Sequence, residues 1–191
     1  MRCHDPPPIA ADTLRETLVR LVAGMTGLRD DGTFHEPNLD GTAGNYLSFD
    51  AWEWPQGVGM YGLVQLWMRR RDPALRARIE DWYKGHLARG LPGLNINTTA
   101  PMLGLAMLWA QTRDPRWQGA LDDGATRLVR DPPRTPEVGL QHDVSDRVNP
   151  ANCGTTRCSW QGCSWRAMGQ PRAGPRCWTR PCGSFWFPPA I

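Results

Sequence analysis

Three short stretches of this sequence carry side chains whose types and spacing could do chemistry. The first, WEWPQGVGMYGL at residues 52–63, places Trp54 and Gln56 where a helix is expected to begin. An aromatic ring can stack on the C–H face of a sugar while an amide hydrogen-bonds its hydroxyl groups, so this pair suits carbohydrate binding. The alternative is that Trp52 and Trp54 are core residues at the start of a buried helix. Three nearby glycines would let another backbone approach closely: Gly57, Gly59 and Gly62.

The second stretch, LNINTTAPMLGLAMLW at residues 94–109, places four short polar side chains directly before an apolar helix. These residues are Asn95, Asn97, Thr98 and Thr99. One of them is expected to cap the helix, because its side chain can accept a hydrogen bond from the first free backbone N–H groups. Four in so short a run are more than one cap requires, which makes this segment a second candidate for ligand binding.

The third stretch, VGLQHDVSD at residues 138–146, is an expected loop that carries Gln141, His142 and Asp143. Histidine is a common acid, base or metal ligand, but an isolated histidine is more often structural. A structural role is expected for His4, His35 and His86.

The elements that must position these stretches are helices. Leucines, valine and methionine recur at helical spacing over residues 12–28, and a loop rich in glycine, aspartate and asparagine follows over residues 29–50. An internal repeat comes next: GLVQLWMRRRDP begins at residue 62 and GLAMLWAQTRDP at residue 104, a period of 42 residues. Each copy predicts a helix that stops before Arg-Asp-Pro, where Asp caps the next helix and Pro occupies its first turn.

The helices that follow the two copies are expected over residues 74–89 and 116–130, and no stretch alternates like a strand. The predicted fold class is therefore all-α, built from tandem helical hairpins that bury their apolar faces by stacking. Such hairpins form an open solenoid or a closed (α/α) toroid. About five helices are visible, so a closed ring of about twelve would need a longer chain.

Charge and composition exclude several classes of protein. The net charge is +3, but the residues before 151 hold 17 basic against 19 acidic side chains, which gives no nucleic-acid footprint. No window approaches the roughly 18 apolar residues of a membrane span, and the N-terminus lacks the apolar core of an export signal. We therefore expect a cytoplasmic protein of one domain, with a disordered segment at residues 1–11 and no cofactor or metal ion.

The composition changes abruptly after residue 151. Five of the six cysteines and four of the ten tryptophans lie there, whereas the last acidic residue is Asp146. The cysteines could hold zinc or form disulfides, but their five-residue spacing is wider than the tight pairs of structural zinc sites. The tail also lacks helical periodicity, so an irregular structure is expected for it.

The three polar stretches, in this order and at this spacing, resemble glycoside hydrolase family 105, the unsaturated rhamnogalacturonyl hydrolases, and more distantly family 88. The resemblance covers about residues 12–150 and rests on WEWPQGVGMYGL, NINTTAPML and GLQHDVSD. It implies an (α/α)6 barrel, incomplete in this chain. It also implies that Trp54, Gln56, Asn97 and His142 line a sugar site, although the family often has Asp in the region matched to Asn97.

The resemblance implies an unusual hydrolysis of pectin-derived (rhamnogalacturonan) oligosaccharides. In that family an Asp protonates the C4=C5 double bond of a terminal 4,5-unsaturated uronic acid and directs water to C5, and the resulting hemiketal opens to release the sugar. The Asp lies in a motif like LWDDTLFM, a dozen or so residues after a QH pair. This sequence has no such motif, and Asp143 does not replace it because it lies beside His142. No residue is therefore assigned as catalytic, and the printed chain is expected to be inactive.

A shift of reading frame explains both the missing motif and the unusual tail. When each third codon base is grouped with the next two, Asn152 with Cys153 forces Leu, and Trp160 with Gln161 forces Ala. Between these two positions, codons can be chosen for the printed residues so that the shifted frame reads LWDDTLFM in full. We therefore interpret residues 12–150 as a partial barrel domain and residues 151–191 as translated out of frame after the loss of one base near Pro150.

Two other functions remain open from the sequence. A non-catalytic helical-repeat module could bind a carbohydrate or another partner, and it would need a capped, polar last repeat. A different (α/α)-barrel enzyme, such as a sugar epimerase, would be favoured if the shifted-frame match were a coincidence.

Overall fold

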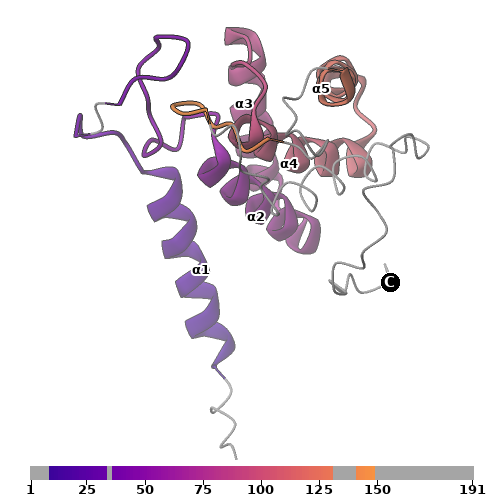
Figure 1. The fold of residues 1–191 in the computed structure, drawn as a ribbon. Helices are drawn as coiled ribbons and strands as arrows, with labels where there is room; N and C mark the ends of the chain where they lie inside the picture. The colour runs from indigo at the N-terminus through magenta and orange to yellow at the C-terminus, as the bar shows by residue number, and fades with distance from the viewer. Residues whose placement is uncertain (1–8, 34–35, 131–140, 149–191) are drawn as a thin grey trace, which may run out of the picture.

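The computed structural model describes residues 9–33, 36–130 and 141–148, and these residues form helices and loops without a β-strand (Figure 1). The α-helices are α1 (Ala11–Thr26), α2 (Trp54–Arg70), α3 (Pro73–Arg89), α4 (Ile96–Thr112) and α5 (Gln118–Arg130), and a 3-10 turn, η1 (Pro115–Trp117), precedes α5. The all-α fold class is confirmed. The N-terminal segment that was expected to be disordered lies outside the described residues, except for residues 9–11. The tail that was expected to be irregular and out of frame also lies outside them. Helix α1 begins at Ala11, one residue before the expected start.

The internal repeat has the same backbone geometry in both copies. Arg71 and Arg113 end α2 and α4 in the left-handed region, with φ of 53° and 52°. Asp72 then caps α3 by accepting from the backbone of Ala74, and Asp114 caps η1 in the same way. The Arg-Asp-Pro signal thus stops one helix and starts the next, as the sequence predicts, except that the second copy begins with a 3-10 turn.

Helices α2 and α4 run side by side in the same direction and form the centre of the fold. A Cβ placed on Gly57 would lie 2.6 Å from the backbone carbon of Ala100, so the two helices approach closely at their N-terminal ends. Gly59 instead faces Met25 of α1. The expectation of a close approach is wrong for Gly62, where an added Cβ would meet nothing within 4 Å.

The core is a cluster of aromatic and aliphatic side chains between α2, α3 and α4. The rings of Trp52 and Trp82 stack with centroids 5.3 Å apart, and the indole N–H of Trp52 donates to the carbonyl of Thr98 at 2.7 Å. The hydroxyl of Tyr83 donates to the carbonyl of Pro101 at 2.9 Å. The buried polar atoms of Trp52 and Tyr83 therefore have partners, as buried aromatic side chains usually do. Trp52 is thus a core residue, as the alternative interpretation of its stretch held.

The arrangement is that of an (α/α) array whose alternate helices belong to two layers. Helices α2 and α4 are parallel neighbours and form the inner layer (Figure 1). In the sequence, α3 follows α2 and α5 follows α4, and these two helices belong to the second layer. Helix α1 stands at one edge, with none of its residues buried. The fold is an incomplete (α/α)6 barrel, as expected.

Candidate functional site

The four sugar-site candidates gather at one end of the inner layer. Trp54 and Gln56 lie in the first turn of α2, and Asn97 lies in the first turn of α4. His142 belongs to the loop 141–148, which reaches the same end because the backbone N–H of Ile96 donates to the carbonyl of Asp143 at 3.3 Å (Figure 1). Parallel packing of α2 and α4 is what brings these distant stretches together.

A hydrogen-bond network fixes the loop 141–148 against both helices. Asn95 caps α4 in a reciprocal capping box with Thr98, and its side-chain amide donates to the hydroxyl of Ser145 at 2.9 Å. That hydroxyl in turn donates to the carboxylate of Glu53, and the carbonyl of Ser145 accepts from the backbone of Leu39 at 2.7 Å. Ser145 therefore joins the two helix ends and the loop between α1 and α2.

Glu53 is the functional-site residue that the sequence analysis missed. It is the residue before α2 and is 7% exposed. Burial raises the pKa of its carboxyl group, and the nearby charge of Asp146 adds to the rise, whereas hydrogen bonds from Ser145 and Asn97 oppose it. Within the described part of the chain, its Oε2 atom has no hydrogen-bond partner. The only signal in the sequence is an acidic residue between two tryptophans.

Tyr46 adds a second raised pKa at this end of the fold. Its hydroxyl donates to a carboxylate oxygen of Asp146 at 3.3 Å. Burial, followed by the charges of Glu53 and Asp146, raises the pKa of Tyr46 to about 12. The raised pKa keeps the phenol protonated at neutral pH, where it can donate a hydrogen bond.

The four candidate side chains differ in their exposure to solvent. Trp54 is 53% exposed, so one of its surfaces is available for stacking. Gln56 is buried, and its amide N–H group donates to the carbonyls of Tyr46 at 3.1 Å and Ser48 at 2.8 Å, which holds the α1–α2 loop. Asn97 is buried beside Glu53, and His142 is half-buried.

The site can bind polar groups, but it presents no cluster of metal ligands. No group of three or more His, Cys, Asp or Glu side chains within residues 9–33, 36–130 and 141–148 is placed to hold a metal ion. In the loop, the amide of Gln141 donates to the carboxylate of Asp143 at 2.9 Å. An exposed ring, a buried carboxyl group and several amides form the kind of surface that binds a hydroxylated ligand.

Glu53→Gln is expected to remove a pH-dependent loss of stability. Because the folded-state pKa of Glu53 lies above 4.5, the folded protein binds more protons than the unfolded chain from pH 4.5 upward, and the wild type loses stability as the pH rises through that window. Urea unfolding of both proteins between pH 4 and 7 should show the variant gaining on the wild type as the pH rises. A constant difference between Glu53→Gln and the wild type over this pH range would contradict the assignment.

Comparison with known proteins identifies the family. The sequence model of glycosyl hydrolase family 88 matches residues 29–153, about two thirds of the chain. The chain belongs to glycosyl hydrolase family 88. No curated protein matches significantly.

Two crystal structures show how much of a family 88-like protein this chain represents. One, from Klebsiella pneumoniae subsp. pneumoniae MGH 78578, is described as a possible member of the GH105 family and has a TM-score of 0.79 and 26% identity. The other, from Salmonella enterica subsp. enterica serovar Paratyphi A, bears the same description, with a TM-score of 0.79 and 27% identity. Each alignment covers 87% of this chain but 44% of the solved one, so this family 88 chain spans less than half the length of either structure.

None of the helices in the described part of this family 88 chain is both long and apolar enough to cross a bilayer.

Proposed function

We propose that this chain is the N-terminal part of a hydrolase that removes 4,5-unsaturated uronic acid from pectin-derived oligosaccharides in the cytoplasm, without a cofactor. The observation that carries the proposal is the convergence of Trp54, Asn97 and His142 at the N-terminal ends of two parallel inner helices. Membership of family 88 supports a carbohydrate substrate.

The geometry suggests which part of the sugar each of these side chains would contact. The exposed ring of Trp54 is available to stack on the sugar. Asn97 and His142 would donate to or accept from its hydroxyl and carboxylate groups. Gln56 would act indirectly, by holding the α1–α2 loop in place, because its amide N–H group already donates to two backbone carbonyls of that loop. By analogy with the family, proton transfer to the double bond belongs to the Asp of the LWDDTLFM motif, which the printed sequence lacks, so the printed chain should bind without turnover.

The path of the chain supports the interpretation that the acid was lost through a change of reading frame. The loop 141–148 ends beside the N-terminal ends of α2 and α4, which is where a third parallel inner helix would begin. The match to the family model stops at residue 153, next to the expected slip near Pro150. The shifted frame accommodates LWDDTLFM at that point, so the missing Asp would enter the site from this third helix.

Restoring the frame tests the proposed function. The DNA should be resequenced across codons 145–160, and one base added near codon 150 if none was missed. With an unsaturated galacturonyl disaccharide, the restored chain is expected to consume the ultraviolet absorbance of the double bond, whereas the 191-residue chain gives no change. Absorbance loss by the 191-residue chain would contradict the assignment of the acid. Binding without turnover by both chains would favour the non-catalytic module.

A variant of the restored chain tests the sugar site itself. Trp54→Ala is expected to raise KM by roughly fivefold, because one stacking face worth about 1 kcal/mol is lost. Val58→Ala, at an exposed position one turn further along α2, is the control. Equal KM values for the two variants would contradict the assignment of Trp54 to the sugar site.

A further inference from the structure

We propose that Glu53 is a positioning residue, which turns the side-chain amide of Asn97 so that its carbonyl oxygen, and not its NH2 group, is presented to a hydroxyl group of the sugar. The inference rests on the proposed function in one respect, namely that a sugar binds beside Asn97. It adds the group that decides which end of the amide the sugar meets.

The positioning begins at the N-terminal end of α4. The side-chain oxygen of Asn95 accepts from the backbone N–H groups of Asn97 at 2.8 Å and Thr98 at 3.0 Å. The NH2 group of the same amide therefore points away from the helix, and it donates to the hydroxyl of Ser145 at 2.9 Å. The helix cap thus fixes the direction of the first hydrogen bond in a series.

Ser145 extends this series to Glu53. Since the hydroxyl oxygen of Ser145 accepts from Asn95, its single proton is free to point elsewhere, and it is donated to Oε1 of Glu53. The side chain of Asn97 donates a hydrogen bond to the same carboxyl group. An ionised carboxylate has only acceptors, so the amide of Asn97 must turn its NH2 group towards Glu53.

The end of Asn97 that remains is an acceptor. The oxygen and nitrogen of an amide lie on different sides of its carbon atom, so the carbonyl oxygen is turned away from Glu53. Glu53 and Asn97 are 7% and 8% exposed, and solvent therefore competes little for the hydrogen bond between them. The sugar would meet an oxygen that accepts from a hydroxyl group and repels a carboxylate.

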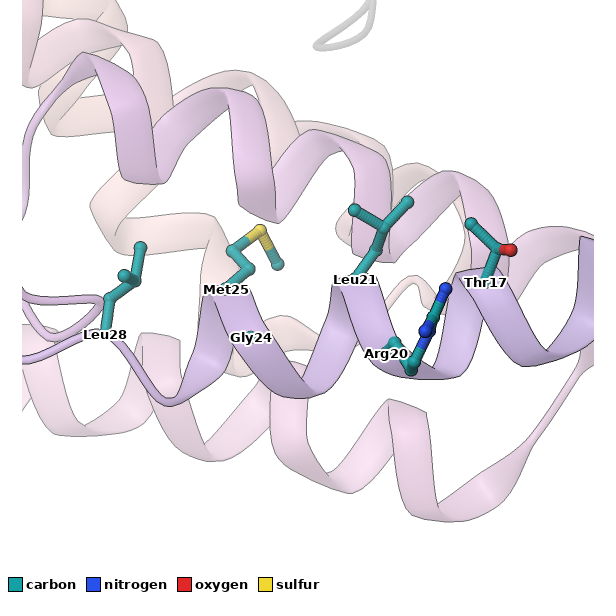
Figure 2. Close-up of a pocket in the computed structure, with 6 residues that line it drawn as sticks. All are labelled: Thr17, Arg20, Leu21, Gly24, Met25 and Leu28. Carbon is teal, nitrogen blue, oxygen red and sulfur yellow. The ribbon is translucent and has the colours of Figure 1, made fainter.

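The recess along α1 takes no part in this arrangement. It is lined by Thr17, Arg20, Leu21, Gly24, Met25 and Leu28 (Figure 2). None of these six residues is acidic or carries an amide side chain, and none belongs to α2, α4 or the loop 141–148. Exposed positions on α1 therefore serve as controls for the site at the N-terminal ends of α2 and α4.

Exchanging the acid and the amide tests the assignment. Binding of an unsaturated galacturonyl disaccharide to the 191-residue chain is measured by titration calorimetry at pH 7. Glu53→Gln should raise Kd by about fivefold, because the new NH2 group can donate to Asn97 and turn its amide round. Glu53→Gln combined with Asn97→Asp, the reversed pair, should restore the affinity, because the new amide then donates to the new carboxylate, whose second oxygen accepts from the sugar. Glu16→Gln, at an exposed position of α1, is the matched control and should leave Kd unchanged.

Asn97→Asp alone gives a readout that a purely structural role of Glu53 would not move. It sets two carboxyl groups against each other, so that they share one proton, and its affinity for the sugar should fall as the pH rises from 5 to 8 and that proton is lost. The reversed pair should show no such fall. Asp146 and Tyr46 are the titratable groups that face Glu53, and they are common to both variants.

Several outcomes would overturn the inference. They are an unchanged Kd for Glu53→Gln, a reversed pair that binds no more tightly than Glu53→Gln, equal pH profiles for Asn97→Asp and the reversed pair, and no binding by the wild-type chain. Circular dichroism first confirms that each variant is folded, and the two pH profiles remain decisive if Glu53→Gln is not. The expected affinities without turnover by the frame-restored chain would contradict only the proposed function. Turnover by that chain, with equal affinities for all variants, would contradict only this inference.

Discussion

Gly57→Ala is expected to lower the free energy of unfolding by about 3 kcal/mol, at the upper end of the cost of overpacking. The new methyl group would lie 2.6 Å from the backbone carbon of Ala100 and 2.7 Å from the backbone nitrogen of Pro101. Neither is the end of a flexible side chain, so α2 and α4 would have to separate. Urea unfolding followed by circular dichroism measures the loss.

Gly62→Ala in the same helix is the matched control, and its effect should have the opposite sign. Gly62 is exposed, and its added Cβ would meet no atom within 4 Å. Alanine there is expected to stabilise the protein by roughly 0.5–1 kcal/mol, because glycine is a poor helix former. Equal effects for the two substitutions would show that the α2–α4 contact is looser than described.

His86 is expected to make the protein sensitive to acid, by about 3 kcal/mol between pH 6.5 and 4. Its ring is 5% exposed and packs on Trp82, with ring centroids 4.2 Å apart. Burial and the charge of Arg89 lower the pKa of His86 to about 4, although Asp50 opposes them. The folded protein therefore binds fewer protons than the unfolded chain in this window, and stability falls as the pH drops from 6.5 towards 4.

The comparison with His86→Gln isolates this effect from the titration of the carboxylates. Asp50 and Arg89 are the charged groups that face the ring, with Asp50 Oδ1 3.5 Å from Nε2 and Arg89 Nη2 3.3 Å from Nδ1. Urea unfolding at pH 7, 5.5 and 4 should show the stability of the wild type falling faster than that of the variant. Parallel curves would contradict the depressed pKa.

The helices could be predicted from the sequence because their signals are local. The cap at Asp72 and the capping box at Asn95 depend on bonds that span only two or three residues. Glu53 could not be found in the same way, since its burial and its hydrogen bond depend on Ser145, 92 residues further along the chain. The roles of Gly57 and Gly62 could not be separated either, because what faces each one is set by helix packing and not by the neighbouring letters.

At the candidate site, too, some features could be predicted from the sequence and others could not. The resemblance directed attention to Trp54, Gln56, Asn97 and His142, and the structure places them at one end of the fold. It also shows that Gln56 is committed to backbone carbonyls while Trp54 is open to solvent, which residue types alone do not reveal. Their roles in sugar binding stay predictions.

The repeated hairpins have a consequence for the order in which the chain folds. The strongest helix packing in this region joins α2 to α4, one hairpin apart in the sequence, so it can form as soon as α4 has been made. During synthesis, α2, α3 and α4 can therefore associate before residues beyond 150 leave the ribosome. A change of reading frame near residue 150 would come too late to prevent that association. The product would then be a folded hairpin array with an exposed edge, a species that chaperones recognise.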